Sequence, residues 1–191
     1  MKKSIRLFIC ALLALSVWSC SKGQQEQAGL NEKIQDTFMG AMFGDSIGTV
    51  IRKFSENDLV PDISYMTRSW VSFGHKKLEF FSFGDMSWEY VNTSYVNGKL
   101  GAIRFYTPFK SKEAAKKRYE EIKSAVQKKY KLELYEPSDT LVYEAYKGYD
   151  KQGSEVRVTY SKYESIGNEI WYSAALTYAT NKFDNEANEE L

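Results

Sequence analysis

Apolar residues recur at the three- and four-residue spacing of an amphipathic helix in two segments of the chain. In the first, Asp45 or Ser46 is suited to be the N-cap, and the apolar positions are Ile47, Val50, Ile51 and Phe54. In the second, Ser111 is the N-cap and Glu113 lies in the first turn, where the helix dipole favours negative charge. Its apolar positions are Ala115, Tyr119, Ile122 and Val126. The pattern predicts two helices, each with one face in the core.

The segments between and after these helices have the pattern of β-strands. Asn97-Gly98 supplies the positive φ angles of a type I′ turn, which predicts a hairpin of residues 87–95 with 100–107. Further strands are predicted in "WVSFGHKKLEFFSF" and at 132–135, 141–149, 156–162 and 170–178. Because the connections are too short for parallel crossovers, consecutive strands should be antiparallel. We therefore expect an α+β fold in which two helices back an antiparallel sheet of about six to eight strands.

The predicted order is helix, meander, helix, meander. In this layout the chain resembles exported β-lactamase-inhibitor-like domains of tandem helix-plus-meander build. The resemblance covers the order of elements over residues 38–180, where we expect a single domain, and it is carried by no motif. Two similar halves remain an alternative, at the level of pattern alone. The resemblance implies binding rather than catalysis.

The N-terminus has the layout of a secretory signal peptide over residues 1–19. Lys2, Lys3 and Arg6 precede an apolar run over 7–17, which is shorter than the roughly 20 residues of a transmembrane helix. The run ends in Val-Trp-Ser-Cys, which resembles the lipobox of bacterial lipoproteins, although Trp18 replaces a small residue. The resemblance implies that Cys20 becomes a lipidated N-terminus carrying acyl chains such as palmitate. The alternative is ordinary cleavage after Ser19, which leaves a free thiol.

A lipoprotein of this kind belongs to the cell envelope, and we expect the outer membrane of a Gram-negative bacterium, reached through the N-terminal lipid. Residues 20–37 begin with a polar, glutamine-rich stretch and are predicted to be a tether. Residues 181–191, "NKFDNEANEEL", are predicted to be an acidic disordered tail. Which side of the membrane the domain faces is not encoded in these residues.

Charge and cysteine content exclude several function classes. Removal of residues 1–19 takes three of the 26 basic side chains and none of the 25 acidic ones, so the mature chain is near neutral and lacks the basic excess of nucleic-acid-binding domains. The two cysteines are Cys10 and Cys20, so the folded part holds no structural disulfide or thiolate metal site. His75, in "GHKK", is the single histidine and is expected in a turn. We predict no cofactor and no metal.

Two candidate sites follow from the remaining residues. Asp85 and Glu89 are paired carboxylates beside aromatic residues, the arrangement that a glycan hydrolase would need. The other candidate is the sheet face opposite the helices, because Tyr, Trp and Arg are enriched at binding hot spots. Alternation along the strands predicts for that face Trp88, Tyr90, Arg104, Tyr106, Arg157 and Trp171.

The sequence therefore predicts a lipid-anchored envelope protein that is a non-catalytic binding module for a protein or glycan partner. One alternative is a glycan-acting hydrolase that uses Asp85 and Glu89. The other is a purely structural envelope component, in which the aromatic residues only stabilise neighbouring strands.

Overall fold

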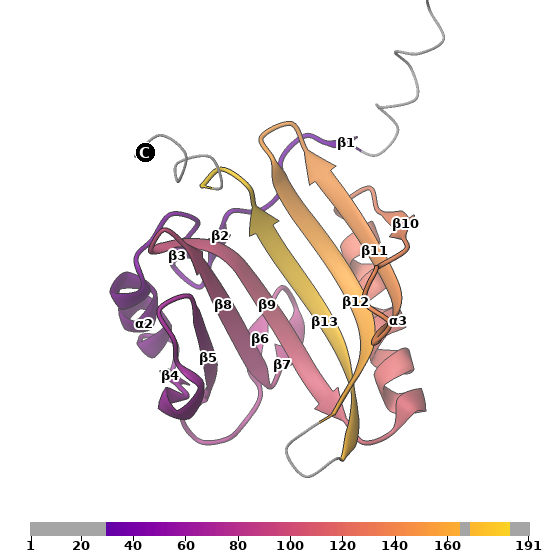
Figure 1. The fold of residues 1–191 in the computed structure, drawn as a ribbon, viewed down its shortest axis with the longest axis horizontal. Coiled ribbons are helices and arrows are strands. Elements are labelled where there is room, and N and C mark those ends of the chain that lie inside the picture. The colour runs from indigo at the N-terminus through magenta and orange to yellow at the C-terminus, as the bar shows by residue number, and fades with distance from the viewer. Residues whose placement is uncertain (1–29, 165–168, 184–191) are drawn as a thin grey trace, which may run out of the picture.

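The computed structural model describes residues 30–164 and 169–183, which form an α+β fold with a nine-stranded sheet (Figure 1). The sheet order is β1-β11-β12-β13-β9-β8-β5-β4, and β10 also pairs with β11. Its strands are β1 (Leu30–Asn31), β4 (Leu59–Pro61), β5 (Trp70–His75), β8 (Tyr90–Val96), β9 (Lys99–Phe109), β10 (Glu133–Tyr135), β11 (Val142–Asp150), β12 (Ser154–Glu164) and β13 (Ile170–Thr180). Two hairpins lie outside it, β2 (Thr37–Phe38) with β3 (Ala41–Met42), and β6 (Phe81–Phe83) with β7 (Met86–Trp88).

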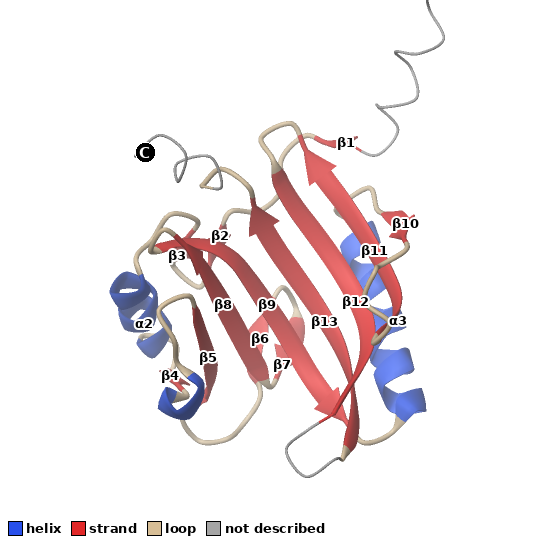
Figure 2. Cartoon of the chain, in the orientation of Figure 1, coloured by secondary structure: helices blue, strands red, loops and turns tan. Residues whose placement is uncertain are grey.

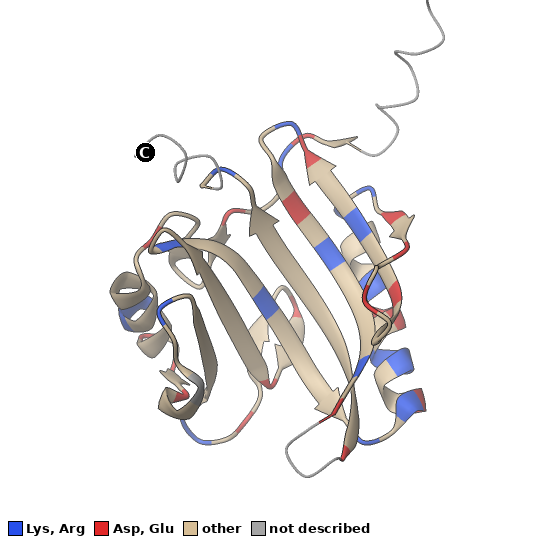
Figure 3. Ribbon diagram, viewed as in Figure 1, with Lys and Arg blue, Asp and Glu red and all other residues tan. Residues whose placement is uncertain are grey.

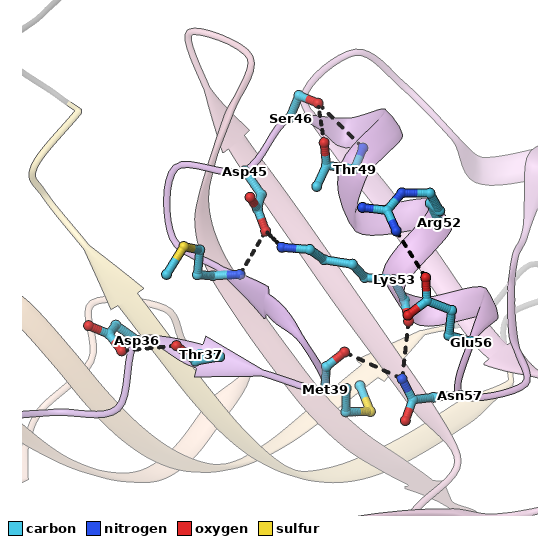
Figure 4. A network of polar contacts seen from close by, with 11 residues as sticks. Asp36, Thr37, Met39, Asp45, Ser46, Thr49, Arg52, Lys53, Glu56 and Asn57 are labelled. Atoms are coloured by element: carbon cyan, nitrogen blue, oxygen red, sulfur yellow. Dashed lines mark hydrogen bonds and ion pairs between the residues drawn. The ribbon is translucent and has the colours of Figure 1, made fainter.

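The helix α2 (Ile47–Ser55) begins at Ser46, as predicted, because the Ser46 hydroxyl accepts a hydrogen bond from the Thr49 N–H at 3.3 Å. The neighbouring Asp45 carboxylate accepts from the Met42 N–H at 2.9 Å and pairs with Lys53 Nζ at 2.8 Å (Figure 4). Through Asp45, these contacts tie β3 and the segment before the N-cap to Lys53 in the last turn of the helix. A single 3₁₀ turn, η1 (Ile63–Tyr65), follows β4.

The helix α3 (Lys112–Gln127) also begins at the predicted cap, Ser111, whose hydroxyl accepts from the Ala114 N–H at 3.2 Å. All four predicted apolar positions of this helix are buried. In Figure 2, α3 lies behind the sheet and α2 lies at one end of it. Buried residues of both helices belong to one core, so the helices cover the same face of the sheet.

The predicted hairpin at Asn97-Gly98 is confirmed. Both residues have positive φ, 51° and 74°, and they join β8 to β9. Phe105 of β9 is fully buried on the helix-covered face and stacks on Phe83 at a centroid distance of 4.1 Å. The β6–β7 hairpin therefore covers the centre of the sheet between the two helices.

The prediction of a wholly antiparallel sheet is wrong at one edge. β1 runs parallel to β11, with Leu30 opposite Tyr149. The Asn31 side chain holds it there, because its amide donates to the Lys131 and Tyr149 carbonyls at 3.2 and 3.1 Å and accepts from the Lys131 N–H at 2.7 Å. The sheet is therefore mixed.

The order of elements also differs from helix, meander, helix, meander. Three short strands precede α2, and the β6–β7 hairpin interrupts the first meander. Part of the predicted tether over 20–37 belongs to the fold, since Ile34 is fully buried and residues 30–31 form β1. The described part of the predicted tail over 181–191 also contacts the fold, since the Asn97 amide donates to the Phe183 carbonyl at 3.3 Å. Residues 1–29, 165–168 and 184–191, and with them the predicted signal peptide and Cys20, lie outside the described residues.

Candidate functional site

The face of the sheet opposite the helices is uncovered over its central strands, and we call it the open face. The strand register sets one row of residues across it: Asn92, Arg104, Thr177, Arg157 and Lys147, on β8, β9, β13, β12 and β11. Because side chains alternate along a strand, the residues on either side of Arg104 point to the core, and Ile103 and Phe105 are fully buried there. Figure 3 shows the basic positions of β9, β12 and β11 across this part of the sheet.

A cavity of about 600 Å³ lies over this row. Its floor is formed by β8, β9, β13, β12 and β11, and one wall is the segment from Tyr135 to Leu141. That wall is shaped by Asp139, whose carboxylate accepts a hydrogen bond from the Leu141 N–H at 2.8 Å. The floor carries a set of hydroxyl side chains: Thr159, Ser161, Ser173 and Thr177. The volume is that of a site for a small molecule.

Arg104 is the central charge of the cavity. One guanidinium nitrogen donates to the Ser173 hydroxyl at 3.3 Å, and the guanidinium lies 5.4 Å from the Tyr106 ring centroid. Its Nε–H is buried and has no hydrogen-bond partner among the described residues, and no carboxylate of those residues forms an ion pair with it. Burial lowers the pKa of the Arg104 guanidinium, with a smaller contribution from the nearby charge of Arg157. An arginine nonetheless stays protonated.

Arg157 is the second charge, and it differs from Arg104 in having a carboxylate partner. It pairs with Glu155, two residues earlier on the same strand. Its Nε–H is also buried without a partner among the described residues. Lys147, next in the row, lies with its Nζ 3.6 Å from the Tyr135 ring centroid. The row therefore carries three cations, and neither Arg104 nor Lys147 has an opposing charge within ion-pair distance in the described part of the chain.

Tyrosine side chains border the cavity next to Arg104. The rings of Tyr90 and Tyr106 stack at a centroid distance of 5.4 Å with an angle of 27° between them. Burial raises the pKa of Tyr106, and it raises the pKa of Tyr163 to about 12, so both hydroxyls are neutral near pH 7. Neutral phenols can both donate and accept hydrogen bonds. The arrangement can hold a polar ligand that also presents a flat surface to a ring.

The structure brings together four of the six residues predicted for the open face: Tyr90, Arg104, Tyr106 and Arg157. Trp171 lies on the same face but near one end of β13, where Lys110 Nζ is 4.7 Å from its ring centroid. It does not line the cavity.

The prediction that Trp88 lies on the open face is wrong. Its side chain is fully buried in the core, and its indole Nε1–H donates to the Phe83 carbonyl at 3.0 Å. The reason is that Trp88 ends β7 of the separate hairpin, whereas Tyr90 begins β8 of the main sheet. The alternation of side chains between the two faces holds within one strand and does not continue from β7 through Glu89 into β8.

The paired carboxylates and the histidine lie outside the cavity. Asp85 is exposed in the β6–β7 turn with φ of 60°, and Glu89 lies between β7 and β8. Neither lines the cavity. His75 ends β5, and its Nδ1 accepts from the Lys77 N–H at 3.4 Å in the turn that follows.

Several residues of the cavity were not predicted: Asn92 and the hydroxyl set on the floor. Lys147, which lies in the same row but does not line the cavity, was not predicted either. Each is a small or polar residue in a strand, which is ordinary on any solvent-facing sheet. Only the pairing of β9 with β13 and of β13 with β12 places them beside the two arginines. The signal that could have found them is the alternation along β12, where Arg157, Thr159, Ser161 and Tyr163 share one face.

Across residues 30–164 and 169–183, no three His, Cys, Asp or Glu side chains are placed to hold a metal ion. In the same part of the chain, no helix has the length and apolar character needed to cross a bilayer. Comparison with protein-family models, curated proteins and solved structures found no match. The function must therefore be argued from the site itself.

Proposed function

We propose that this protein is a lipid-anchored protein of the cell envelope, held on the outer membrane through Cys20, and that its open face is a non-catalytic binding site. The observation that carries the proposal is the cavity with Arg104 at its centre. A cation buried without an opposing charge costs free energy, so it is retained where a ligand supplies the missing partner.

The arrangement of the sheet supports a finer proposal, that the domain consists of two similar halves. One half runs from α2 to β9 and the other from α3 to β13, and their last strands pair antiparallel at the centre of the sheet. The cavity spans this central pairing. A site made by joining two halves would then have one arginine from each, Arg104 and Arg157.

The binding function is tested by filling the cavity. Thr177 lies between the two arginines, so Thr177→Trp would occupy the space above the floor. Ala179→Trp is the matched control, because Ala179 is on the same strand and the same face, two residues along, and does not line the cavity. The full chain and both variants are immobilised, and material bound from an envelope extract is identified by mass spectrometry of proteins and glycans.

We expect the wild type and the Ala179→Trp protein to retain the same bound species and the Thr177→Trp protein to lose it. Retention by all three proteins, or by none, would refute a binding role for the cavity. The anchor is tested separately: Cys20→Ala should move the protein out of the membrane fraction and abolish the mass of the lipid. A Cys20→Ala protein that still sediments with membranes would rule the lipid anchor out.

A further inference from the structure

The unpaired groups of the cavity define the chemistry of the ligand. Two buried Nε–H donors, of Arg104 and Arg157, and one buried acceptor, Asn92 Oδ1, have no hydrogen-bond partner among the described residues. All three side chains line the cavity. A ligand that satisfies them must present acceptors to the arginines and a donor to the amide. An inorganic anion without a hydroxyl group, such as sulfate, offers only acceptors and leaves the amide oxygen without a donor.

The arginines are placed to share one anionic group or two neighbouring ones. Arg104 and Arg157 lie on strands separated only by β13, and both pair with Thr177. Adjacent strands are about 4.8 Å apart, which puts the two Cα atoms roughly 10 Å from each other. Guanidinium groups match the geometry of carboxylate and phosphate oxygens in bidentate hydrogen bonds. The negative group of the ligand is therefore expected over Thr177.

The rest of the floor is suited to hydroxyl groups. Ser161 and Ser173 are hydrogen bonded to each other at 2.8 Å. Thr159 lies on the strand of Ser161, one same-face row away, and Thr177 lies on the strand of Ser173, two rows away. Each hydroxyl can both donate and accept, so the pair retains capacity for a ligand hydroxyl. Tyr106, backed by its stacking on Tyr90, offers a ring surface beside Arg104.

We propose that the cavity binds an acidic saccharide, with its carboxylate or phosphate group held by Arg104 and Arg157 and its hydroxyl groups bound by Asn92 and the Ser and Thr side chains of the floor. This inference rests on the proposed function and names its ligand class. An acidic peptide fits less well, because its side chains bring few hydroxyl donors to this floor, whereas a sugar ring carries several. The volume of about 600 Å³ also suits a small, compact ligand.

The test uses three probes that share the glucose ring and differ at C6: glucuronate, glucose 6-phosphate and neutral glucose. Each is titrated into the full chain by calorimetry, beside an aspartate-rich peptide. We expect at least one acidic sugar to bind at least tenfold more tightly than glucose, because a hydrogen bond to a charged group is strong. Arg104→Gln should weaken that acidic sugar about 10- to 100-fold and leave glucose nearly unchanged.

Two variants keep the result interpretable. Arg104→Lys retains the charge and should recover part of the lost affinity. Lys110→Gln removes a cation that does not line the cavity and that pairs with Glu169 at 2.9 Å. This variant should bind the acidic sugar like the wild type. Thermal unfolding confirms that each variant is folded.

Equal affinity for glucose and the acidic sugars, or unchanged affinity in Arg104→Gln, would overturn the inference. So would binding of the acidic peptide with no binding of either acidic sugar. These outcomes are separable from failure of the proposed function. If Thr177→Trp still abolishes capture from the envelope extract, the cavity is a binding site and only its assignment to acidic saccharides is wrong.

Discussion

The substitution Arg104→Met distinguishes between two roles of Arg104, ligand binding and stabilisation of the fold. Methionine carries no charge and reaches as far as the Nε position of arginine, so it fills the space of the arginine stem without the buried guanidinium. If Arg104 is there for a ligand, its removal should leave the free energy of unfolding of the ligand-free protein little changed. If it is there for the fold, the loss should be large.

The structure sets the size of each contribution. The substitution removes the hydrogen bond to Ser173 at 3.3 Å, about 0.5–1.5 kcal/mol, and the contact with the Tyr106 ring at 5.4 Å, about 0.5–2 kcal/mol. It also removes the unpaired Nε–H, whose burial costs about 1–3 kcal/mol. The substitution also removes the repulsion between Arg104 and Arg157, which at a separation of roughly 10 Å stabilises the variant by at most about 1.5 kcal/mol. The losses come to about 1–3.5 kcal/mol and the gains to about 1–4.5 kcal/mol, so the expected net loss does not exceed about 2.5 kcal/mol.

The assay is urea unfolding followed by circular dichroism, with the m-value compared between proteins to confirm that the same surface is exposed. The matched control is Phe105→Ala, the next residue on β9. It points to the core, is fully buried and stacks on Phe83, so its removal should cost about 3–5 kcal/mol. A loss above about 3 kcal/mol for Arg104→Met would refute the argument, because Arg104 would then be a structural residue.

Three further predictions address the core and one partly exposed charge. Trp88→Phe removes the hydrogen bond from Nε1 to the Phe83 carbonyl and should cost about 1–3 kcal/mol in urea unfolding while capture from the envelope extract is unchanged; loss of capture in a stable protein would place Trp88 in the site after all. Gly148→Ala puts a Cβ 2.2 Å from the Lys131 carbonyl oxygen, so the melting temperature should fall by several degrees, and an unchanged value would contradict the close approach there. Burial raises the pKa of Glu144, but the Lys116 ammonium and the Tyr119 hydroxyl outweigh it and hold that pKa below 4.5. Because the pKa of Glu144 is lower in the folded state than in the unfolded state, Glu144 stabilises the fold above a pH of about 4.5, and this contribution is lost as the pH falls. Glu144→Gln should therefore be less stable than wild type by about 1–2 kcal/mol at pH 7, and the two proteins should become equally stable in acid. A stability difference that persists at low pH would exclude the ionised carboxylate as its cause.

Local signals in the sequence predicted the elements that local chemistry decides. Ser46 and Ser111 cap the two helices as expected, and Asn97-Gly98 forms the expected turn. β1 had no such signal, because its two residues are held by the side chain of Asn31 bonding to residues about 100 positions away. A two-residue strand fixed by tertiary hydrogen bonds has no periodicity to read.

The site was predictable only in part, for the same reason. Arg104 and Tyr106 follow from alternation within β9, next to a recognisable turn. The position of Arg157 beside Thr177, and of Thr177 beside Arg104, depends on register between strands far apart in the chain. A slip of one residue in either pairing would move the row to the core face. Trp88 shows the result of such an error. Its predicted face was counted by alternation from Tyr90 in β8, but Trp88 belongs to the separate β6–β7 hairpin.

The same strands carry both the core and the site, and this explains how the fold tolerates a costly open face. Across β9, β13 and β12 the core row is Phe105, Leu176 and Val158, all buried, and the neighbouring row on the opposite face is Arg104, Thr177 and Arg157. Because the core row holds the strands in register, the arginines are positioned by paired backbone rather than by a loop. Among the described residues, the segment from Tyr135 to Leu141 supplies a wall outside the central strands. Changes in that wall can therefore alter which ligand fits while the charges on the floor stay where the sheet places them.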